Sequence, residues 1–370
     1  MISREEIKLK ERYILDCLEK ELDKNEMSKD QFDEMKFSLL AYLSLDYIEL
    51  INQPLRFLLK EILLGYAPLN KKCSEIRENI LKTIKINIPK VSNEYIYFLI
   101  ELLNNLTRIK IDYSNDCKEL SYYPFKSYSI ISTSYLFYNY LNDIDFLDIS
   151  GNILGNSSHY DFKDKIFSNG IAKIAGTTKY DYYFNKPYFI CEKSNNLSVY
   201  QVFNHEMMHA IELYISPKKR LMSSVFREIS PYTMDHLFLD FLEQNNYNIN
   251  DVNALRRRQY AYVKGLSCYV LNNLFNRFEC KYGEISEDTI NYENIRSILT
   301  TEMLRRMFEI VSCVVAEGLY RQILVNKKQG LTNLKSLIMN YNFEDDVPDF
   351  SFVGLSNKKL IKISEKMCKK

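Results

Sequence analysis

Apolar residues recur at helical spacing through the first part of the chain, from residue 1 to about 112, with charged residues between them. Glu94–Ile109 is the clearest amphipathic run of this kind. Leu39–Leu64 is strongly apolar, but charged residues such as Asp46 and Glu49 interrupt it. We therefore predict buried helices in this part of the chain and no membrane-spanning segment.

The pattern changes after Asp112. Residues 125–200 are rich in Tyr, Phe, Ile, Ser and Thr, and glycines separate short runs in which apolar and polar residues alternate. Alternation of this kind at Tyr128–Ser132 and Ile171–Ala175 is typical of strands. A third run, Lys186–Cys191, has its proline near the start, where a strand tolerates one. These runs together predict a small β-sheet.

Helical spacing returns at Ser198 and continues to the end of the chain, with one helix expected at Phe226–Glu243 and a short one from Ser356. Loops are predicted near Pro217 and at residues 245–251, 282–288, 327–330 and 343–355. The order helix, small sheet, helix predicts a mainly α fold.

Composition excludes several classes of protein. The chain has 370 residues, of which 46% are hydrophobic and 26% charged, and its net charge is +1, as in an ordinary soluble globular protein. Basic residues cluster tightly only at Arg256–Arg258, which gives no support for nucleic-acid binding. The first twenty residues lack the apolar core of a signal peptide. The eight cysteines form no C-x-x-C pair, which is typical of reduced thiols, so we expect a cytoplasmic location.

One stretch carries its own chemistry: His205-Glu206-Met207-Met208-His209 is a His-Glu-x-x-His motif, the signature of zinc proteases. Residues four apart lie on one face of a helix, so both imidazoles can bind one metal ion. Glu206 stands beside the first of them and is placed to act as a general base. The flanking residues contain no Gly or Pro close to the motif, so a continuous helix is expected. The competing interpretation is a buried helix with two hydrogen-bonded histidines.

A catalytic zinc ion takes three protein ligands, so a third must lie elsewhere in the chain. Glu212 lies on the same helix beyond reach of the metal. Glu228 opens the next predicted helix, and a helix that returns beside the first would bring this carboxylate to the metal. Asp235, two turns later, is either a helix-surface acid or a hydrogen-bond acceptor for a ligand His. The acidic residues considered downstream of His209 are Glu212, Glu228, Asp235, Asp240 and Glu243.

Four segments make the chain resemble the thimet oligopeptidase and oligoendopeptidase F family of zinc metallopeptidases, which is of the gluzincin type. Phe226–Asp235 is similar to the family's Phe-x-Glu-x-x-Ser-x-x-x-x-Glu segment. Ile174–Thr177 and Asn185–Ile190 look like its Gly-Ala-Tyr strand and its Asn-Pro-Tyr-Ile segment, and Leu274–Glu279 looks like a helix that ends in Phe-x-x-Phe-Glu. The resemblance covers about residues 140–350.

The resemblance implies two helical lobes around a cleft, with a small β-sheet next to the zinc-binding helix. It implies one Zn²⁺ per chain, with Glu228 as the third ligand and Asp235 at the later acidic position. A strand near Ala175 and Gly176 would hold a short or unfolded peptide in extended form. We divide the chain into an N-terminal helical region, 1–112, and a catalytic region, 113–370. The catalytic region holds the sheet (125–197), the zinc helices (198–243) and the C-terminal helices (250–370).

The chain departs from the family in two places. Met208 stands where the family usually has Gly. The family also carries Tyr, and often His, in a late helix, where they donate hydrogen bonds to the tetrahedral intermediate. Our alignment places these tyrosines at Val311, Cys313 and Val315, so Tyr320 is the nearby candidate donor. The alternative donors are loop tyrosines, namely Tyr180, Tyr182 and Tyr183.

These departures leave more than one function open. The first hypothesis is a zinc endopeptidase or oligopeptidase in which Glu206 takes a proton from water. The alternative is a catalytically weak or inactive zinc-containing protein that binds peptides on the same fold. A purely structural zinc site is a weaker hypothesis, because such sites close the fourth position with another Cys or His. A peptide substrate is the expected partner, and the sequence does not give the oligomeric state.

Overall fold

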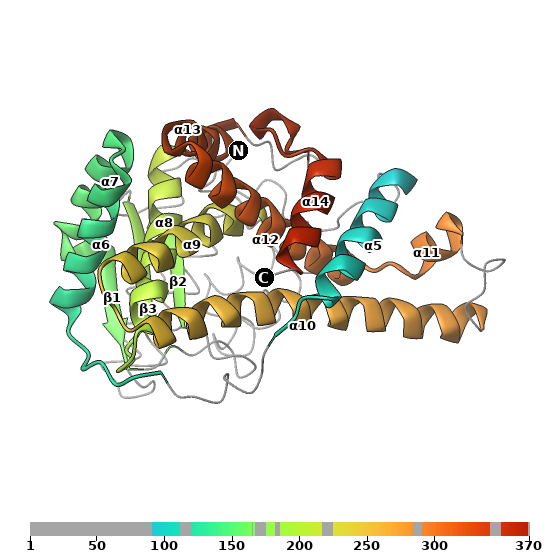
Figure 1. Cartoon of the computed structure of the whole chain (residues 1–370), viewed down its shortest axis with the longest axis horizontal. Coiled ribbons are helices and arrows are strands. Elements are labelled where there is room, and N and C mark those ends of the chain that lie inside the picture. The colour runs from blue at the N-terminus through green and yellow to red at the C-terminus, as the bar shows by residue number, and fades with distance from the viewer. Residues whose placement is uncertain are drawn as a thin grey trace, which may run out of the picture. The chain divides into compact units, whose positions relative to one another are not determined.

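The computed structural model describes residues 91–111, 120–164, 166, 175–181, 186–216, 225–283, 291–340 and 349–368. Within these residues helices dominate and the strands form one small sheet, which confirms the predicted mainly α fold (Figure 1). The chain divides into two compact units. Unit 1 comprises residues 1–85, 148–193 and 210–223, and unit 2 comprises residues 86–147, 194–209 and 224–370. The predicted helices before residue 91, including Leu39–Leu64, lie outside the described residues.

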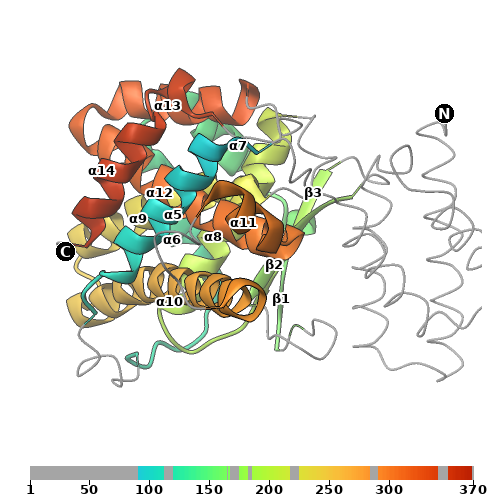
Figure 2. The same ribbon diagram turned by 90° about the vertical axis from the view of Figure 1, so that its right-hand side faces the viewer.

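The helix expected at Glu94–Ile109 is present as α5, Asn93–Thr107. It begins after Ser92, whose hydroxyl accepts a hydrogen bond from the Tyr95 N–H at 3.2 Å, as a helix cap does. Its apolar side packs against two helices of the C-terminal half, α10 (Ile249–Tyr282) and α14 (Asn357–Met367) (Figure 2). The last helix before residue 112 is therefore part of unit 2. The predicted boundary at residues 112 and 113 stays a prediction.

The strand predicted at Tyr128–Ser132 is wrong, because these residues lie in a helix, α6, Ser127–Leu141. The buried side chains of α6 recur every three or four residues, which is a helical period. Phe137 among them packs edge-on against Phe238 and Phe241 of α9 (Ile229–Gln244), with ring centroids 5.1 and 5.6 Å apart. Packing of this one apolar side outweighs the β-propensity of the Tyr, Ile, Ser and Thr residues around it.

The loop predicted at residues 327–330 is also wrong. The connection between α12 (Thr301–Val325) and α13 (Lys327–Asn340) is Asn326, and Gly330 lies inside α13. A Cβ at Gly330 would lie 2.5 Å from the backbone of Ile323. This glycine therefore serves the close approach of two helices and marks no turn.

The sheet lies in unit 1 and contains β1 (Tyr160–Lys163), β2 (Gly176–Asp181) and β3 (Lys186–Glu192) in the order β1-β3-β2. The central strand β3 pairs parallel with β1 and antiparallel with β2. β3 confirms the strand predicted at Lys186–Cys191. The strand predicted at Ile171–Ala175 falls outside the described residues except for Ala175, whose carbonyl accepts a hydrogen bond from the Glu192 N–H at 2.7 Å.

The described residues from Ser198 onward are mainly helical, as predicted. Helix α12 forms the centre of unit 2, since most of its side chains are buried and it packs against α5, α9, α10, α13 and α14. Among the described residues, no helix is long and apolar enough to cross a membrane. The remaining elements are α7 (Ile144–Leu154), η4 (Ser157–His159), α8 (Ser198–Ile215), η6 (Val225–Glu228), α9 (Ile229–Gln244), α11 (Tyr292–Ile298) and η7 (Ser351–Val353).

Candidate metal centre

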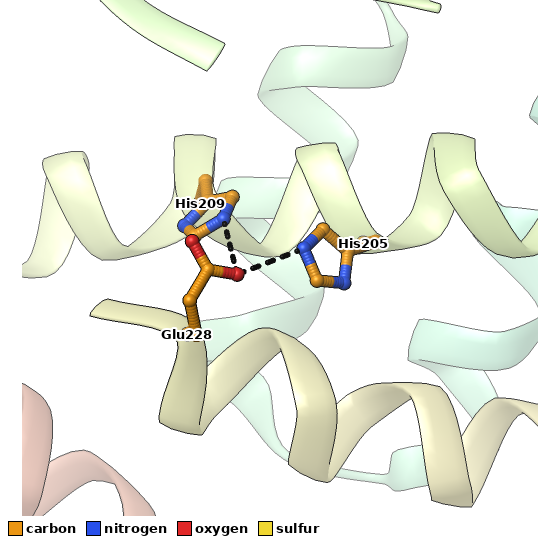
Figure 3. Close-up of side chains that lie close together, drawn as sticks. All are labelled: His205, His209 and Glu228. Atoms are coloured by element: carbon orange, nitrogen blue, oxygen red, sulfur yellow. Dashed lines mark ion pairs between the residues drawn. The ribbon is translucent and has the colours of Figure 1, made fainter. Parts of the chain in front are cut away.

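The two histidines of the His-Glu-x-x-His motif lie on one face of α8, as the sequence predicts. No Pro or Gly interrupts α8, so the helix is continuous through the motif. His205 and His209 stand one turn apart, with ring centroids 5.1 Å from each other and ring planes at 81°. The helix thus presents two imidazoles toward the same point (Figure 3).

Glu228 faces both imidazoles from the following helical segment. It is the last residue of η6 and precedes the first turn of α9. Its Oε2 atom lies 3.2 Å from Nε2 of His205 and 3.5 Å from Nε2 of His209 (Figure 3). One ligand atom from each of the three residues lies within 4.8 Å of the other two. Within the described part of the chain this is the one cluster of three or more His, Cys, Asp or Glu residues that could hold a metal ion.

Asp235 lies behind the first imidazole. Its Oδ2 atom is 2.9 Å from Nδ1 of His205, and its side chain is buried. Because a carboxylate can only accept a hydrogen bond, Nδ1 is the nitrogen that carries the proton. The other ring nitrogen, Nε2, faces Oε2 of Glu228. Of the two interpretations that the sequence left open for Asp235, the structure supports the acceptor of a hydrogen bond from a ligand His.

The charges around the cluster favour a cation. Burial alone lowers the pKa of His205, but Asp235 and Glu228 outweigh this effect and hold that pKa well above its usual value. Burial raises the pKa of Glu228, but His209 and His205 outweigh it and hold that pKa well below its usual value. Two carboxylates thus surround the imidazoles with negative charge. Two imidazole nitrogens and one carboxylate oxygen that converge in a negative environment form a donor set that fits a divalent metal ion.

Glu206 is 7% exposed and follows His205 directly on α8. Its predicted role as general base stays a prediction. Met208, which stands where the resembling family has Gly, is fully buried on the same helix.

The hydroxyl of Tyr320, the donor predicted for the tetrahedral intermediate, is engaged in a different interaction. It donates a hydrogen bond to Oδ2 of Asp240 at 2.7 Å, and its ring stacks on His236 with centroids 5.1 Å apart. Asp240 also accepts a hydrogen bond from Arg256 at 2.6 Å. The side chains at the three aligned tyrosine positions, Val311, Cys313 and Val315, are buried in α12. The catalytic assignment of Tyr320 stays a prediction.

Tyr232 was not selected from the sequence, but it lies at the cluster. Its ring contacts that of His205 edge-on, with centroids 5.5 Å apart. Burial raises the pKa of its hydroxyl, and the nearby groups of Cys313 and Glu228 raise it further. Tyr232 follows Glu228 by four residues, so helical spacing contained the signal for it. The predicted donors came from the late helix and the loop tyrosines, and the predicted ligands were acidic, so Tyr232 was missed.

The residues predicted to bind the substrate backbone lie in unit 1. Gly176 and Tyr180 belong to β2, and Ala175 precedes it. Within the described sheet β2 is an edge strand, which is the arrangement that strand addition requires. The alternative donors Tyr182 and Tyr183 lie outside the described residues. The role of β2 in substrate binding stays a prediction.

Comparison with known proteins gave similarity to solved structures alone. No family model matches the chain, and no curated protein matches it. A protein assigned as oligoendopeptidase F from Bacillus anthracis str. Ames is 12% identical, with a TM-score of 0.46 over 85% of this chain and 66% of that one. A PZ peptidase A structure with an inhibitor is 11% identical, with a TM-score of 0.48 over 85% of this chain and 68% of that one.

A third solved structure, also assigned as oligoendopeptidase F, is 12% identical, with a TM-score of 0.43 over 67% of this chain and 49% of that one. This chain thus spans about two thirds or less of the length of each of these proteins. Two of the three bear the name of the family that the sequence segments resemble. At these identities and TM-scores, the similarity does not by itself assign the chain to that family.

Proposed function

We propose that the chain is a zinc-dependent peptidase that hydrolyses short or unfolded peptides. The convergence of His205, His209 and Glu228 supports this proposal most directly, since their ligand atoms lie within 4.8 Å of one another. Imidazole and carboxylate are ligands typical of catalytic zinc sites with three protein ligands. When bound, zinc would supply Lewis acidity toward the peptide carbonyl and would lower the pKa of water.

The side chains of this chain have separate roles in the proposed reaction. His205, His209 and Glu228 would hold the ion, and Asp235 fixes the tautomer and orientation of His205 through the 2.9 Å hydrogen bond. Glu206 takes a proton from the attacking water and passes it to the leaving amine. The edge of β2 pairs with the backbone of an extended peptide, a conformation that folded proteins rarely present.

The alternative is a zinc-containing protein that binds peptides and hydrolyses them slowly or not at all. The hydrogen bond from Tyr320 to Asp240 favours this alternative, because it withdraws the predicted oxyanion donor. A structural zinc site fits less well, because the cluster within the described residues offers three protein ligands and structural sites use four.

Cleavage of a mixed peptide library by the purified protein and by Glu206→Gln, with metal content measured on both, tests the proposal. We expect about one zinc ion per chain in both proteins. Cleavage should fall by about a hundredfold to ten-thousandfold in the variant, which is the contribution of a general base. Zinc in both proteins without cleavage by either would favour the peptide-binding alternative, and no metal in either would overturn both.

A further inference from the structure

Hydrolysis of a peptide places negative charge on the carbonyl oxygen. As water adds, a bond forms between its oxygen and the carbonyl carbon, and the π electron pair of the carbonyl moves onto the carbonyl oxygen. A hydrogen-bond donor aimed at this developing charge is among the largest contributions to catalysis. The donor must lie beside the metal cluster, and its hydrogen must not be engaged by another group of the protein.

Tyr232 has the right place on its helix. Glu228, Tyr232 and Asp235 are spaced four and three residues apart, so they lie on one face of the segment formed by η6 and α9. The outer two of them contact His205 through Oε2 of Glu228 at 3.2 Å and Oδ2 of Asp235 at 2.9 Å. The ring of Tyr232 contacts the same imidazole between them. Tyr232 therefore belongs to the first layer of side chains around the cluster.

The hydroxyl of Tyr232 is also available. Among the described residues, no hydrogen-bond partner of this hydroxyl is observed. Other tyrosines of unit 2 use theirs. Tyr320 donates to Asp240, Tyr260 donates to Glu317, and Tyr262 donates to Glu309.

We propose that Tyr232 is a catalytic residue that donates its phenolic hydrogen to the oxyanion formed on the scissile carbonyl. This assignment rests on the proposed peptidase function. In the addition step the proton of water goes to Glu206, and the oxyanion accepts a hydrogen bond from Tyr232 without taking its proton. In the breakdown step the electron pair returns to re-form the carbonyl, the C–N bond breaks, and the proton passes from Glu206 to the amine.

The test compares Tyr232→Phe with two matched Tyr→Phe variants. Phe keeps the ring against His205 and removes only the hydroxyl, so a role in packing or in orienting His205 would survive the change. Tyr260→Phe is the control, because Tyr260 lies on α10 and its ring is 6.1 Å from that of His236, on the other face of α9. Tyr320→Phe tests the earlier candidate donor. Metal content and far-ultraviolet circular dichroism are measured for every variant.

Steady-state kinetics on a peptide that the wild type cleaves give the first readout. Tyr232→Phe should lower kcat by about a hundredfold to a thousandfold, the loss typical of one oxyanion donor. KM should change by less than about threefold, because the hydroxyl interacts in the transition state and hardly in the ground state. Tyr260→Phe should match the wild type in both constants.

Affinity for a phosphinic peptide, whose tetrahedral anionic centre mimics the intermediate, gives a second readout that does not depend on turnover. Tyr232→Phe should weaken its binding by about tenfold to a hundredfold, as expected for the loss of one hydrogen bond to a charged oxygen. Binding of the matching unmodified peptide to Glu206→Gln should be the same with and without the Tyr232→Phe change.

The other possible results distinguish failure of the role proposed for Tyr232 from failure of the proposed peptidase function. Cleavage by the wild type with unchanged kcat in Tyr232→Phe would overturn the role of Tyr232 and leave the peptidase proposal standing. A loss in Tyr320→Phe alone would return the donor role to Tyr320. A Tyr232→Phe protein that lacks metal would show that the hydroxyl supports the cluster and not the oxyanion. A wild type that cleaves no peptide would overturn both proposals.

Discussion

The two faces of helix α9 hold similar side chains in opposite arrangements. On one face Asp235 accepts a hydrogen bond from His205, and Glu228, just before the helix, faces His205 and His209. His236, the next residue after Asp235, lies on the other face. Its Nε2 atom is 3.7 Å from Oε2 of Glu317 in α12. Each face thus pairs an imidazole with a buried carboxylate, but only the first leaves donor atoms converging on a common point.

On the second face, neighbouring side chains pair with the carboxylates. Glu317 is fully buried and accepts hydrogen bonds from Tyr260 at 3.0 Å and from Arg321 at 2.8 Å. Asp240 accepts hydrogen bonds from Tyr320 and from Arg256. The guanidinium groups balance these carboxylates, so the face needs no further cation. On the first face, which carries Asp235 and is preceded by Glu228, no Lys or Arg among the described residues forms an ion pair with either carboxylate. The arginines on one face, and the lack of such a pairing on the other, therefore separate a stabilising network from a site that can take up a metal.

Removal of Glu228 should have the largest effect and should lower metal affinity alone. Glu228→Ala takes away one of the three proposed ligands. Metal affinity should therefore fall by more than the tenfold to hundredfold that is typical of losing a carboxylate hydrogen-bonded to a metal ligand. Titration with zinc in competition with a chelator measures the affinity. Glu243→Ala, at the far end of α9, is the matched control and should bind zinc like the wild type. Equal affinity in Glu228→Ala and the control would contradict the ligand assignment.

Removal of Glu317 should affect stability and leave the metal in place. Glu317→Ala leaves Arg321 and His236 without their carboxylate, and breaking a fully buried ion pair costs about 3 to 5 kcal/mol. Because the side chain of Arg321 is 30% exposed, we expect a smaller loss, about 2 to 3 kcal/mol in the free energy of unfolding. Urea denaturation of the metal-free proteins measures it. A variant that loses zinc without losing stability would mean that the two faces are not separate.

Tyr320→Phe should have the smallest effect. It removes the hydrogen bond to Asp240, while Arg256 continues to pair with that carboxylate. We expect a loss of about 1 kcal/mol in the free energy of unfolding and unchanged zinc affinity. The same urea denaturation and zinc titration measure both quantities. A large fall in kcat with unchanged stability would instead show that Tyr320 takes part in catalysis.

Much of this arrangement follows from sequence spacing. The i, i+4 spacing of His205 and His209 predicted two imidazoles on one helical face, and the early position of Glu228 in the returning helix predicted its approach to them. The first relation depends on helical geometry alone, whereas the approach of Glu228 also requires the following helix to pack beside α8. The helix from Asn93 was predicted for the same reason, because one of its sides is consistently apolar.

The failures have a different origin. The strand predicted at Tyr128–Ser132 followed residue preferences, whereas the packing of Phe137 on α9 decided for a helix. The hydrogen bond from Tyr320 to Asp240, which lies 80 residues away in the sequence, was not predicted, because no local pattern reveals it. Gly330 looked like a turn residue because its close approach to Ile323 is a tertiary contact.

The proposed metal ligands lie on helices, and this has a consequence for how the protein would take up and release a metal ion. His205 and His209 stand within α8, Glu228 is the last residue of η6, and both η6 and α9 pack against α12. We therefore expect a chelator to remove the ion without unfolding the chain, in contrast to small zinc domains that fold only around their metal. Cobalt could then replace zinc in the intact protein and give it a visible absorption spectrum. In a cell, the availability of the ion would set the active fraction of a population that is already folded.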